Sequence, residues 1–264
     1  AVDQTSGQVY VTDTFNHRVQ RFSSTGAYQA KWGYRGRGTG AAMDYPRGIA
    51  VDPQDRTVWM NNTRSAQIKH YSATGGILGQ FGDQGAGAGQ FYYSRGIHVG
   101  SDSRVYVTDS GNMRIKVHAK SGALLWSAPC GAPALTGNYV LMGCTSVARD
   151  AAGNVYAAAP TEDVVYKFSS TGTLLAKFGS HGTGAGQFDG AYGVAVRGDR
   201  LYVSEMDNNR ISVLTTTGAF VGSFGGAGTA HGRFRRPTAL ALDAQGRLYV
   251  TDTGNERVEV FNVV

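Results

Sequence analysis

Short stretches in which apolar and polar residues alternate recur along the whole chain. Alternation of period two is typical of β-strands, because successive side chains of a strand point to opposite faces of the sheet. No stretch of a dozen residues keeps apolar positions at the i, i+3, i+4 and i+7 spacing of an amphipathic helix. The hydrophobic pattern therefore predicts an all-β protein.

The alternating stretches form a repeat of six copies. Its best-marked strand reads VYVTD, VWMNN, VYVTD, VYAAA, LYVSE and LYVTD, near residues 9, 58, 105, 155, 201 and 248. A short apolar run precedes this strand, a second alternating run follows it, and a turn leads to a fourth run that ends in Phe-Gly or Trp-Gly. Four strands make one antiparallel sheet that must stack on its neighbours to bury both faces. We therefore predict one domain over residues 1–264, a six-bladed β-propeller of four-stranded antiparallel blades.

The two ends of the chain fall within copies of the repeat. The first copy starts at Ala1-Val2-Asp3, inside its innermost strand, and the last copy ends at Val264, directly after its third strand. The last blade is thus expected to lack its outer strand, which would leave the alternating run RVEVFNVV as an exposed edge. We expect the chain to be part of a longer one that completes this blade, or a partner to donate a strand there.

The residues around the second and third strands carry a family resemblance. The segments TDTFNHRVQRF, TDSGNMRIKV, SEMDNNRISV and TDTGNERVEV, with linkers such as FGDQGAGAGQF, resemble the NHL repeat over the whole chain. The resemblance implies a six-bladed propeller. Similar propellers serve as extracellular sensor domains or as RNA- or protein-binding domains, and more distant relatives are lyases or strictosidine-synthase-like enzymes.

Comparison of the six copies separates repeated residues from departures. An acid, an asparagine and an arginine recur at fixed spacing in four copies, whereas two copies lack both the acid and the arginine. Joint loss is expected of a paired, partly buried network, because removal of one partner strands a charge. We interpret this set as structural rather than catalytic: Asp13, Asn16, Arg18, Asp109, Asn112, Arg114, Glu205, Asn208, Arg210, Asp252, Asn255 and Arg257.

The departures from the repeat lie mostly in the linkers between blades. Linkers and the turns between second and third strands are expected on one face, where loop-built sites bind ligands. Arg47 and Arg95 directly precede innermost strands where other copies have Thr145, Tyr192 and Thr238. These positions predict an anion-binding rim, and solvated loop arginines are the alternative. The candidate ligand-binding residues are Arg47, Arg95, Tyr192, Tyr93, Arg235 and Arg236.

Composition and net charge favour some classes of partner over others. There are 25 Lys and Arg against 19 Asp and Glu, a net charge of +6, and 38 glycines with 6 prolines, which suits many turns. This modest basic excess favours a protein, glycan or other anionic ligand over nucleic acid. No apolar run reaches membrane-spanning length, so no membrane insertion is expected in this segment. The Gln-Phe pairs at 90–91 and 187–188 are expected to bury an aromatic ring between blades.

Chemical motifs of an enzyme are scarce. The six histidines show no close metal-ligand spacing, and only His98 falls on an innermost strand. We expect no catalytic residue, no metal and no cofactor, and predict a non-enzymatic ligand-binding, sensor or scaffolding propeller that uses its linker-side face. The alternatives are a lyase or strictosidine-synthase-like enzyme with a site in the axial channel, or an RNA-binding propeller.

The third linker departs most from the repeat and contains both cysteines. Cys130 and Cys144 lie 14 residues apart in LLWSAPCGAPALTGNYVLMGC. A disulfide between them would close this loop and would indicate an oxidising, extracellular or periplasmic compartment. Two buried thiols are the alternative.

Overall fold

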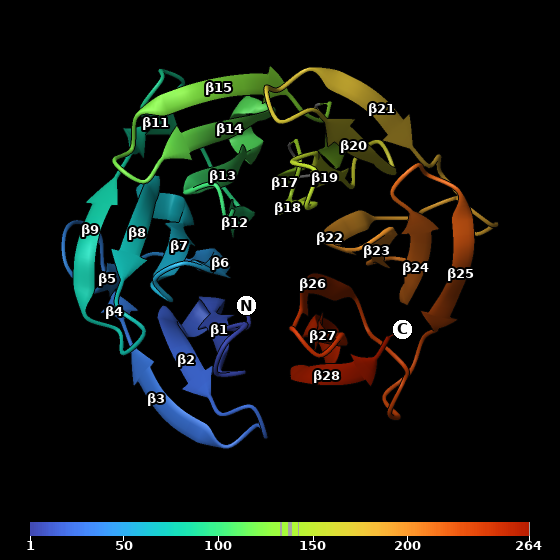
Figure 1. The fold of residues 1–264 in the computed structure, drawn as a ribbon, viewed down its shortest axis with the longest axis horizontal. Coiled ribbons are helices and arrows are strands. Elements are labelled where there is room, and N and C mark those ends of the chain that lie inside the picture. The colour runs from blue at the N-terminus through green and yellow to red at the C-terminus, as the bar shows by residue number, and fades with distance from the viewer. Residues whose placement is uncertain (133, 137–138, 142, 264) are drawn as a thin grey trace. The chain divides into compact units, whose positions relative to one another are not determined.

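The computed structural model describes residues 1–132, 134–136, 139–141 and 143–263. The chain divides into two compact units, residues 1–127 and 128–264, and each contains three successive antiparallel sheets (Figure 1). Among the described residues there is no α-helix, and within each sheet the strands follow chain order. Six such sheets in succession are the blades of a six-bladed β-propeller, so the predicted fold class is confirmed.

Unit 1 holds the first three sheets. Their strands are β1 (Val9–Asp13), β2 (Arg18–Phe22) and β3 (Tyr28–Trp32); β6 (Pro46–Val51), β7 (Val58–Asn62), β8 (Gln67–Tyr71) and β9 (Ile77–Phe81); and β12 (Ile97–Val99), β13 (Arg104–Asp109), β14 (Arg114–Ala119) and β15 (Leu124–Pro129), whose last residues cross into unit 2. In place of an innermost strand, the first sheet has a single bridge between Val2 and Val9.

Unit 2 holds the other three sheets. Their strands are β18 (Ser146–Arg149), β19 (Val155–Ala159), β20 (Val164–Phe168) and β21 (Leu174–Phe178); β22 (Ala191–Arg197), β23 (Arg200–Glu205), β24 (Arg210–Thr215) and β25 (Phe220–Gly225); and β26 (Pro237–Leu242), β27 (Arg247–Asp252) and β28 (Arg257–Asn262). Within the described residues, β28 pairs only with β27, so the sixth blade lacks its outer strand as predicted.

Short elements connect the sheets and form the loop-bearing face of each unit. Four 3₁₀ turns join second and third strands, and two parallel pairs and one hairpin lie in the linkers. The turns are η1 (Thr14–Asn16), η2 (Thr63–Ser65), η3 (Ser110–Asn112) and η4 (Thr253–Asn255); the parallel pairs are β4 (Tyr34–Arg35) with β5 (Ala42–Met43) and β10 (Asp83–Gln84) with β11 (Gln90–Phe91); the hairpin is β16 (Ala134–Thr136) with β17 (Tyr139–Leu141).

Linker aromatic residues fill the spaces between neighbouring sheets of a unit. Phe91 is fully buried with Ile68 of the second sheet and Val105 of the third. Phe188 is equally buried, with Val165 of the fourth sheet and Val203 of the fifth. The predicted role of the two Gln-Phe pairs is therefore confirmed, since each ring removes apolar surface of two sheets from water.

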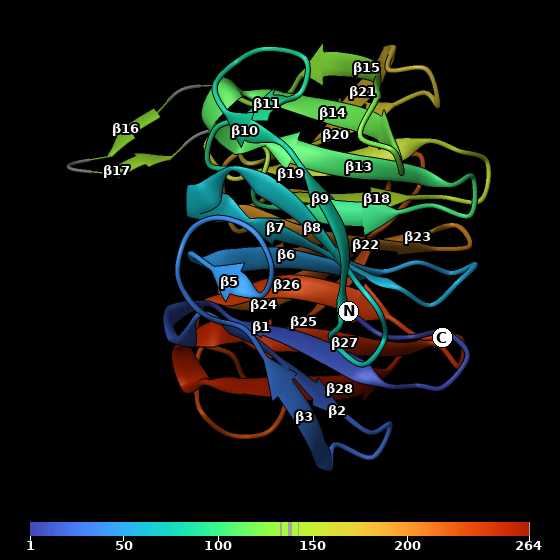
Figure 2. The ribbon, with the colours of Figure 1, turned by 90° about the vertical axis from the view of Figure 1, so that its left-hand side faces the viewer.

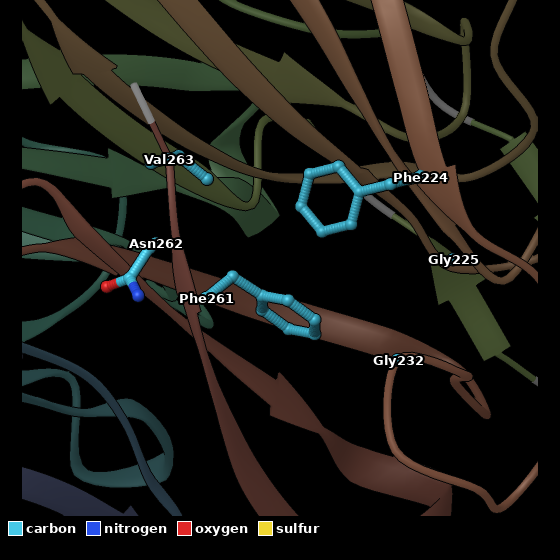
Figure 3. A pocket seen from close by; sticks show the side chains of 6 residues that line it. All are labelled: Phe224, Gly225, Gly232, Phe261, Asn262 and Val263. Carbon is cyan, nitrogen blue, oxygen red and sulfur yellow. The ribbon is translucent and has the colours of Figure 1, made fainter.

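The free edge of β28 borders an apolar hollow. Its volume is about 310 Å³, and it lies between β25 and β28 (Figure 3). The rings of Phe224 and Phe261 lie 5.2 Å apart at its wall. Its lining residues are Phe224, Gly225, Gly232, Phe261, Asn262 and Val263. Strand donation to this edge stays a prediction.

Candidate functional site

Two 3₁₀ turns of unit 1, η1 and η2, are bound to the segment that leads into the next sheet. Thr14 Oγ1 donates to the carbonyl oxygen of Pro46 at 2.7 Å, and Thr63 Oγ1 donates to that of Ser94 at 2.8 Å. The amide of Arg64 also donates to the carbonyl oxygen of Asp44. Turns and linkers therefore share one face of unit 1, as the repeat predicted, and residues from several sheets meet there.

An aromatic cluster with an arginine occupies this face. The Tyr45 ring lies 5.9 Å from Phe15 and 5.0 Å from His17, both in edge-to-face geometry. The guanidinium carbon of Arg64 lies 4.1 Å from the centre of the same ring, in cation–π geometry. Phe15, at the tip of η1, is 80% exposed although it is a large apolar side chain. Phe15 therefore presents a large apolar surface to solvent beside Tyr45.

A second aromatic pair continues the same surface. The rings of Tyr92 and Tyr93 lie 4.9 Å apart, and both are exposed. They adjoin Ser94, which η2 contacts through Thr63, so η2 lies between the two linkers. We call these five residues, Phe15, Tyr45, Arg64, Tyr92 and Tyr93, the aromatic–arginine surface. Only Tyr93 of this set was singled out as a ligand-binding candidate from the sequence.

Arg47 and Arg95 occupy equivalent places at the start of neighbouring inner strands. Arg47 lies in β6 and Arg95 directly precedes β12. Their backbones approach closely, because an added Cβ on Gly48 would collide with the carbonyl oxygen of Arg95. Both side chains are half-buried and engaged in contacts of their own. The structure thus brings this predicted pair together within unit 1.

The other three ligand-binding candidates lie in unit 2. Tyr192 belongs to β22 and is half-buried, and its carbonyl oxygen accepts a hydrogen bond from Thr145 Oγ1 at 2.7 Å. Arg235 and Arg236 precede β26 and are exposed. Arg236 Nη1 lies 3.7 Å from Asp207 Oδ1, so its charge faces an acid of the same unit.

The recurring acid, asparagine and arginine are in direct contact in all four copies. In the third sheet, Arg114 Nε donates to Asp109 Oδ2 at 2.8 Å and Asn112 Nδ2 donates to both carboxylate oxygens. The bond from arginine Nε to the acid measures 2.6 Å in the first sheet and 2.8 Å in the fifth and sixth. In the third, fifth and sixth sheets the arginine and asparagine also bind linker carbonyl groups.

Two buried lysines also bind linker carbonyl groups, and they were not singled out from the sequence. Lys69 Nζ donates to the carbonyl oxygens of Gly38, Gly40 and Ala42 at 3.0, 2.8 and 2.7 Å. Lys116 Nζ donates to three carbonyl oxygens of the next linker, at 2.6 to 2.7 Å. Burial lowers the pKa of each ammonium group to about 8. The second sheet has Gln67 in place of the arginine, so Lys69 supplies the cation that its linker binds.

Three residues of unit 2 could hold a metal ion. The donor atoms of Asp163, His181 and Asp189 all lie within 4.8 Å of one another. His181 Nδ1 lies 2.8 Å from Asp163 Oδ2 and 4.0 Å from Asp189 Oδ1. Burial and the neighbouring carboxylates of Asp189 and Asp163 raise the pKa of Asp207, against the effect of Arg236. The equivalent positions in the following sheet are not acidic, so the repeat itself does not require this cluster.

We predict that the pKa of His181 lies above its ordinary value. The hydrogen bond and charge of Asp163, followed by the charge of Asp189, raise the pKa of the imidazole. Any stability from this ion pair is therefore complete at low pH and is lost as the pH rises through the folded-state pKa. A proton NMR titration measures the value directly, and Asp163→Asn should bring it back towards 6.5. An unshifted histidine in the unmodified chain would contradict the prediction.

His98 takes no part in this cluster. It lies in β12 with its ring 5.9 Å from that of Tyr106 and is half-buried. Among the described residues, no other group of three histidine, cysteine or acidic side chains meets the same donor spacing.

The expected disulfide is present in unit 2. It joins Cys130 to Cys144, whose Cα atoms lie 5.6 Å apart, and the amide of Cys144 donates to the carbonyl oxygen of Cys130. The bond closes the base of the β16–β17 hairpin, which extends away from the sheets of its unit (Figure 2). No helix in the described part of the chain is long and apolar enough to cross a bilayer.

Solved structures resemble the chain in fold. A streptogramin B lyase matches with a TM-score of 0.68 and 14% identity, over 98% of this chain and 76% of that one. A catalytically inactive virginiamycin B lyase from Staphylococcus aureus, with quinupristin, matches with a TM-score of 0.67 and 18% identity, over 99% and 82%. A chain of a nidogen/laminin complex matches with a TM-score of 0.62 and 17% identity, over 84% and 77%. At these identities the likeness is one of fold.

Sequence comparison finds NHL-repeat proteins that are similar to part of the chain. NHL repeat-containing protein 3 of Mus musculus is 32% identical over 112 residues, which are 39% of this chain and 32% of that protein. The Homo sapiens protein is 33% identical over 108 residues, 37% of this chain and 31% of that protein. The match thus spans about a third of these curated relatives. The NHL repeat model matches residues 1–22 and 234–261, in the first and last copies of the repeat. The first and last copies of the repeat thus match the NHL repeat, and the chain is similar to NHL-repeat proteins over part of its length.

Proposed function

We propose that this propeller is a non-enzymatic binding or scaffolding domain that binds an acidic protein through the aromatic–arginine surface of unit 1. The observation that carries the proposal is the exposure of Phe15 beside Tyr45 and Arg64. Aromatic residues and arginine are enriched in protein interfaces and dominate their binding energy. An apolar ring at this degree of exposure costs free energy in water unless a partner covers it.

The charges of unit 1 support an acidic partner. Asp44, the acid of the first linker, is nearly buried and already paired with Arg37 at 2.8 Å. The net charge of the chain is +6, which attracts anionic partners and speeds their encounter. Arg47 and Arg95 extend the cationic character toward the inner strands. A glycan or another anionic ligand would meet the same groups, and the test below distinguishes it.

We also propose an extracytoplasmic setting for this domain. The Cys130–Cys144 disulfide supports it, because disulfides form and persist in oxidising compartments. A fold likeness to a chain of the nidogen/laminin complex adds an example of a similar propeller within a protein assembly. The likeness to lyases keeps an axial-channel enzyme as the alternative.

The proposal is tested with an array of acidic peptides and a parallel array of sulfated and sialylated glycans. Phe15→Ala and Arg64→Ala should each weaken peptide binding by about tenfold, the effect of losing one interface anchor. Arg47→Ala with Arg95→Ala should also weaken binding and flatten its dependence on salt, since paired charges are screened. Arg200→Ala, which removes a partly exposed arginine of unit 2, is the matched control.

Three outcomes would count against the proposal. Binding of glycans alone would replace the acidic protein by a glycan. Equal losses in the Arg200→Ala control would show that only net charge matters. No binding on either array would leave the aromatic–arginine surface without its proposed role and would favour the enzymatic alternative.

A further inference from the structure

In three places, the aromatic residue that ends an outer strand packs on a glycine of the following sheet. This turn glycine lies in the turn that leads into the outer strand of that sheet. A Cβ added to Gly75 would lie 2.6 Å from the Trp32 ring, so the glycine is required for this approach. Phe81 covers Gly122 and Phe178 covers Gly218 in the same way. In all three cases the aromatic residue directly precedes the first glycine of a linker.

The glycine loop of the linker then binds the acid, asparagine and arginine network of the same following sheet. Asn112 Nδ2 donates to the carbonyl oxygen of Gly85 at 2.9 Å, and Asn208 Nδ2 donates to that of Gly182 at 3.0 Å. The terminal amino groups of Arg210 donate to the carbonyl oxygens of Thr183, Gly184 and Gln187 at 2.7 to 3.3 Å. One continuous segment, such as residues 178–188, thus makes both the ring contact and the loop contact.

The first sheet presents the same receiving groups in an uncovered form. A Cβ added to Gly26, its turn glycine, would meet no atom within 4 Å. Within the described part of the chain, Arg18 makes its hydrogen bond through Nε alone, to Asp13 Oδ2, and Asn16 donates only to Asp13 Oδ1. The Asp13 side chain is 19% exposed, whereas its three counterparts, Asp109, Glu205 and Asp252, are fully buried.

We propose that the first sheet is a docking site for a segment of the linker type, an aromatic residue followed by a glycine loop that ends in Gln-Phe. The aromatic ring would cover Gly26, and loop carbonyl groups would accept hydrogen bonds from Asn16 Nδ2 and from the terminal amino groups of Arg18. The amide that directly follows the final Phe of the segment would donate to Asp13, as the amide of Tyr92 donates to Asp109 and that of Arg235 to Asp252.

The chemistry of the site selects this occupant over a charged one. Asp13 already pairs with the Arg18 Nε–H, so the free donors suit neutral carbonyl groups better than a carboxylate beside Asp13. Glycine is needed in the segment because Gly179 and Gly182 adopt φ of +99° and +146°, where side chains are strained. This inference does not depend on the aromatic–arginine surface or on any activity.

A synthetic peptide that copies residues 178–188, FGSHGTGAGQF, with blocked ends is the probe. It is titrated to millimolar concentration into the folded chain while the side-chain signals of Arg18 Nε–H and Asn16 Nδ2–H are followed by NMR. We expect saturable shifts at these two groups and near Gly26. Asn16→Ala and Arg18→Lys should each weaken binding severalfold, and Arg18→Ala at least tenfold. Arg35→Ala, an exposed arginine outside the site, is the matched control.

Two further measurements keep the result decisive. A peptide of the same composition in scrambled order, and one with the first Phe replaced by Ala, should bind at least tenfold more weakly. If Arg18→Ala fails to fold, peptide binding is compared between the unmodified chain and Asn16→Ala, which should fold because Asn16 is exposed. The proposal is overturned if the peptide causes no shifts, if shifts fall elsewhere, or if the scrambled peptide binds equally well.

Discussion

Replacement of Lys116 by alanine is expected to lower the free energy of unfolding by about 3 to 5 kcal/mol, the cost of breaking a buried charged group away from its partners. The substitution leaves three linker carbonyl oxygens without the ammonium that binds them. It also opens a cavity under Phe91, whose ring centre lies 4.8 Å from the Lys116 nitrogen. Chemical denaturation of the unmodified chain and of the variant, with the free energy of unfolding extrapolated linearly to zero denaturant, measures the loss.

The exposed Lys31→Ala is the control for this experiment, because Lys31 lies on the solvent side of β3. It should change the free energy of unfolding by less than about 0.5 kcal/mol. Lys69→Ala should behave like Lys116→Ala, since the two ammonium groups bind their linkers alike. A loss below 1 kcal/mol for both buried lysines would refute the view that these two linkers are held by the ammonium groups of the following sheets.

The same lysines give stability a defined dependence on pH. Burial lowers the pKa of Lys116 to about 8, below the 10.5 of an exposed lysine. Between these values the unfolded chain binds more protons than the folded chain, so this group makes stability rise with pH across that window. The difference between the unmodified chain and Lys116→Ala should therefore be larger at pH 10 than at pH 7.

Much of the fold could be predicted because a repeat supplies its own alignment. The structure has a strand at each of the six predicted positions, near residues 9, 58, 105, 155, 201 and 248, and the sixth blade lacks its outer strand. The disulfide followed from two cysteines in one irregular linker. These features depend on local pattern and spacing, which a sequence displays directly.

The buried lysines could not be recognised in the same way. A lysine on an alternating strand is expected to face solvent, and nothing near Lys69 in the sequence marks the three carbonyl groups 27 to 31 residues earlier. One signal was available: the second sheet lacks the arginine but has a lysine two positions later, on the same face of the strand. The aromatic–arginine surface was missed for a similar reason, because its members converge from separate turns and linkers.

The fourth sheet shows a different way of holding a linker. It has Ala159 and Val164 in place of the acid and the arginine, and the linker before it contains the disulfide. Thr161 Oγ1 donates to the carbonyl oxygen of Ala132 in that linker. The disulfide closes this linker on itself, and Thr161 of the fourth sheet contacts it without an acid or an arginine at the repeated positions.

The second large effect is expected at Glu205 and Arg210 of the fifth sheet. Arg210→Val alone should lower the free energy of unfolding by about 3 to 5 kcal/mol, because it leaves the fully buried Glu205 carboxylate without its cation. The double variant Glu205→Ala with Arg210→Val copies the residues of the fourth sheet. It should cost no more than Arg210→Val alone, since no charge remains to be stranded.

A double-mutant cycle by chemical denaturation measures this coupling, with the surface pair Asp199 and Arg200, whose side chains are 74% and 34% exposed, as the control. The coupling between Glu205 and Arg210 should exceed about 2 kcal/mol, whereas an exposed pair couples by less than about 1 kcal/mol. Additive losses at Glu205 and Arg210 would mean that the arginine serves the linker alone. Arg210 contacts both the Glu205 carboxylate and three linker carbonyl groups, and the cycle separates these two roles. The contact with the carboxylate contributes to the coupling energy. The linker contacts contribute to the loss of stability that remains in the double variant.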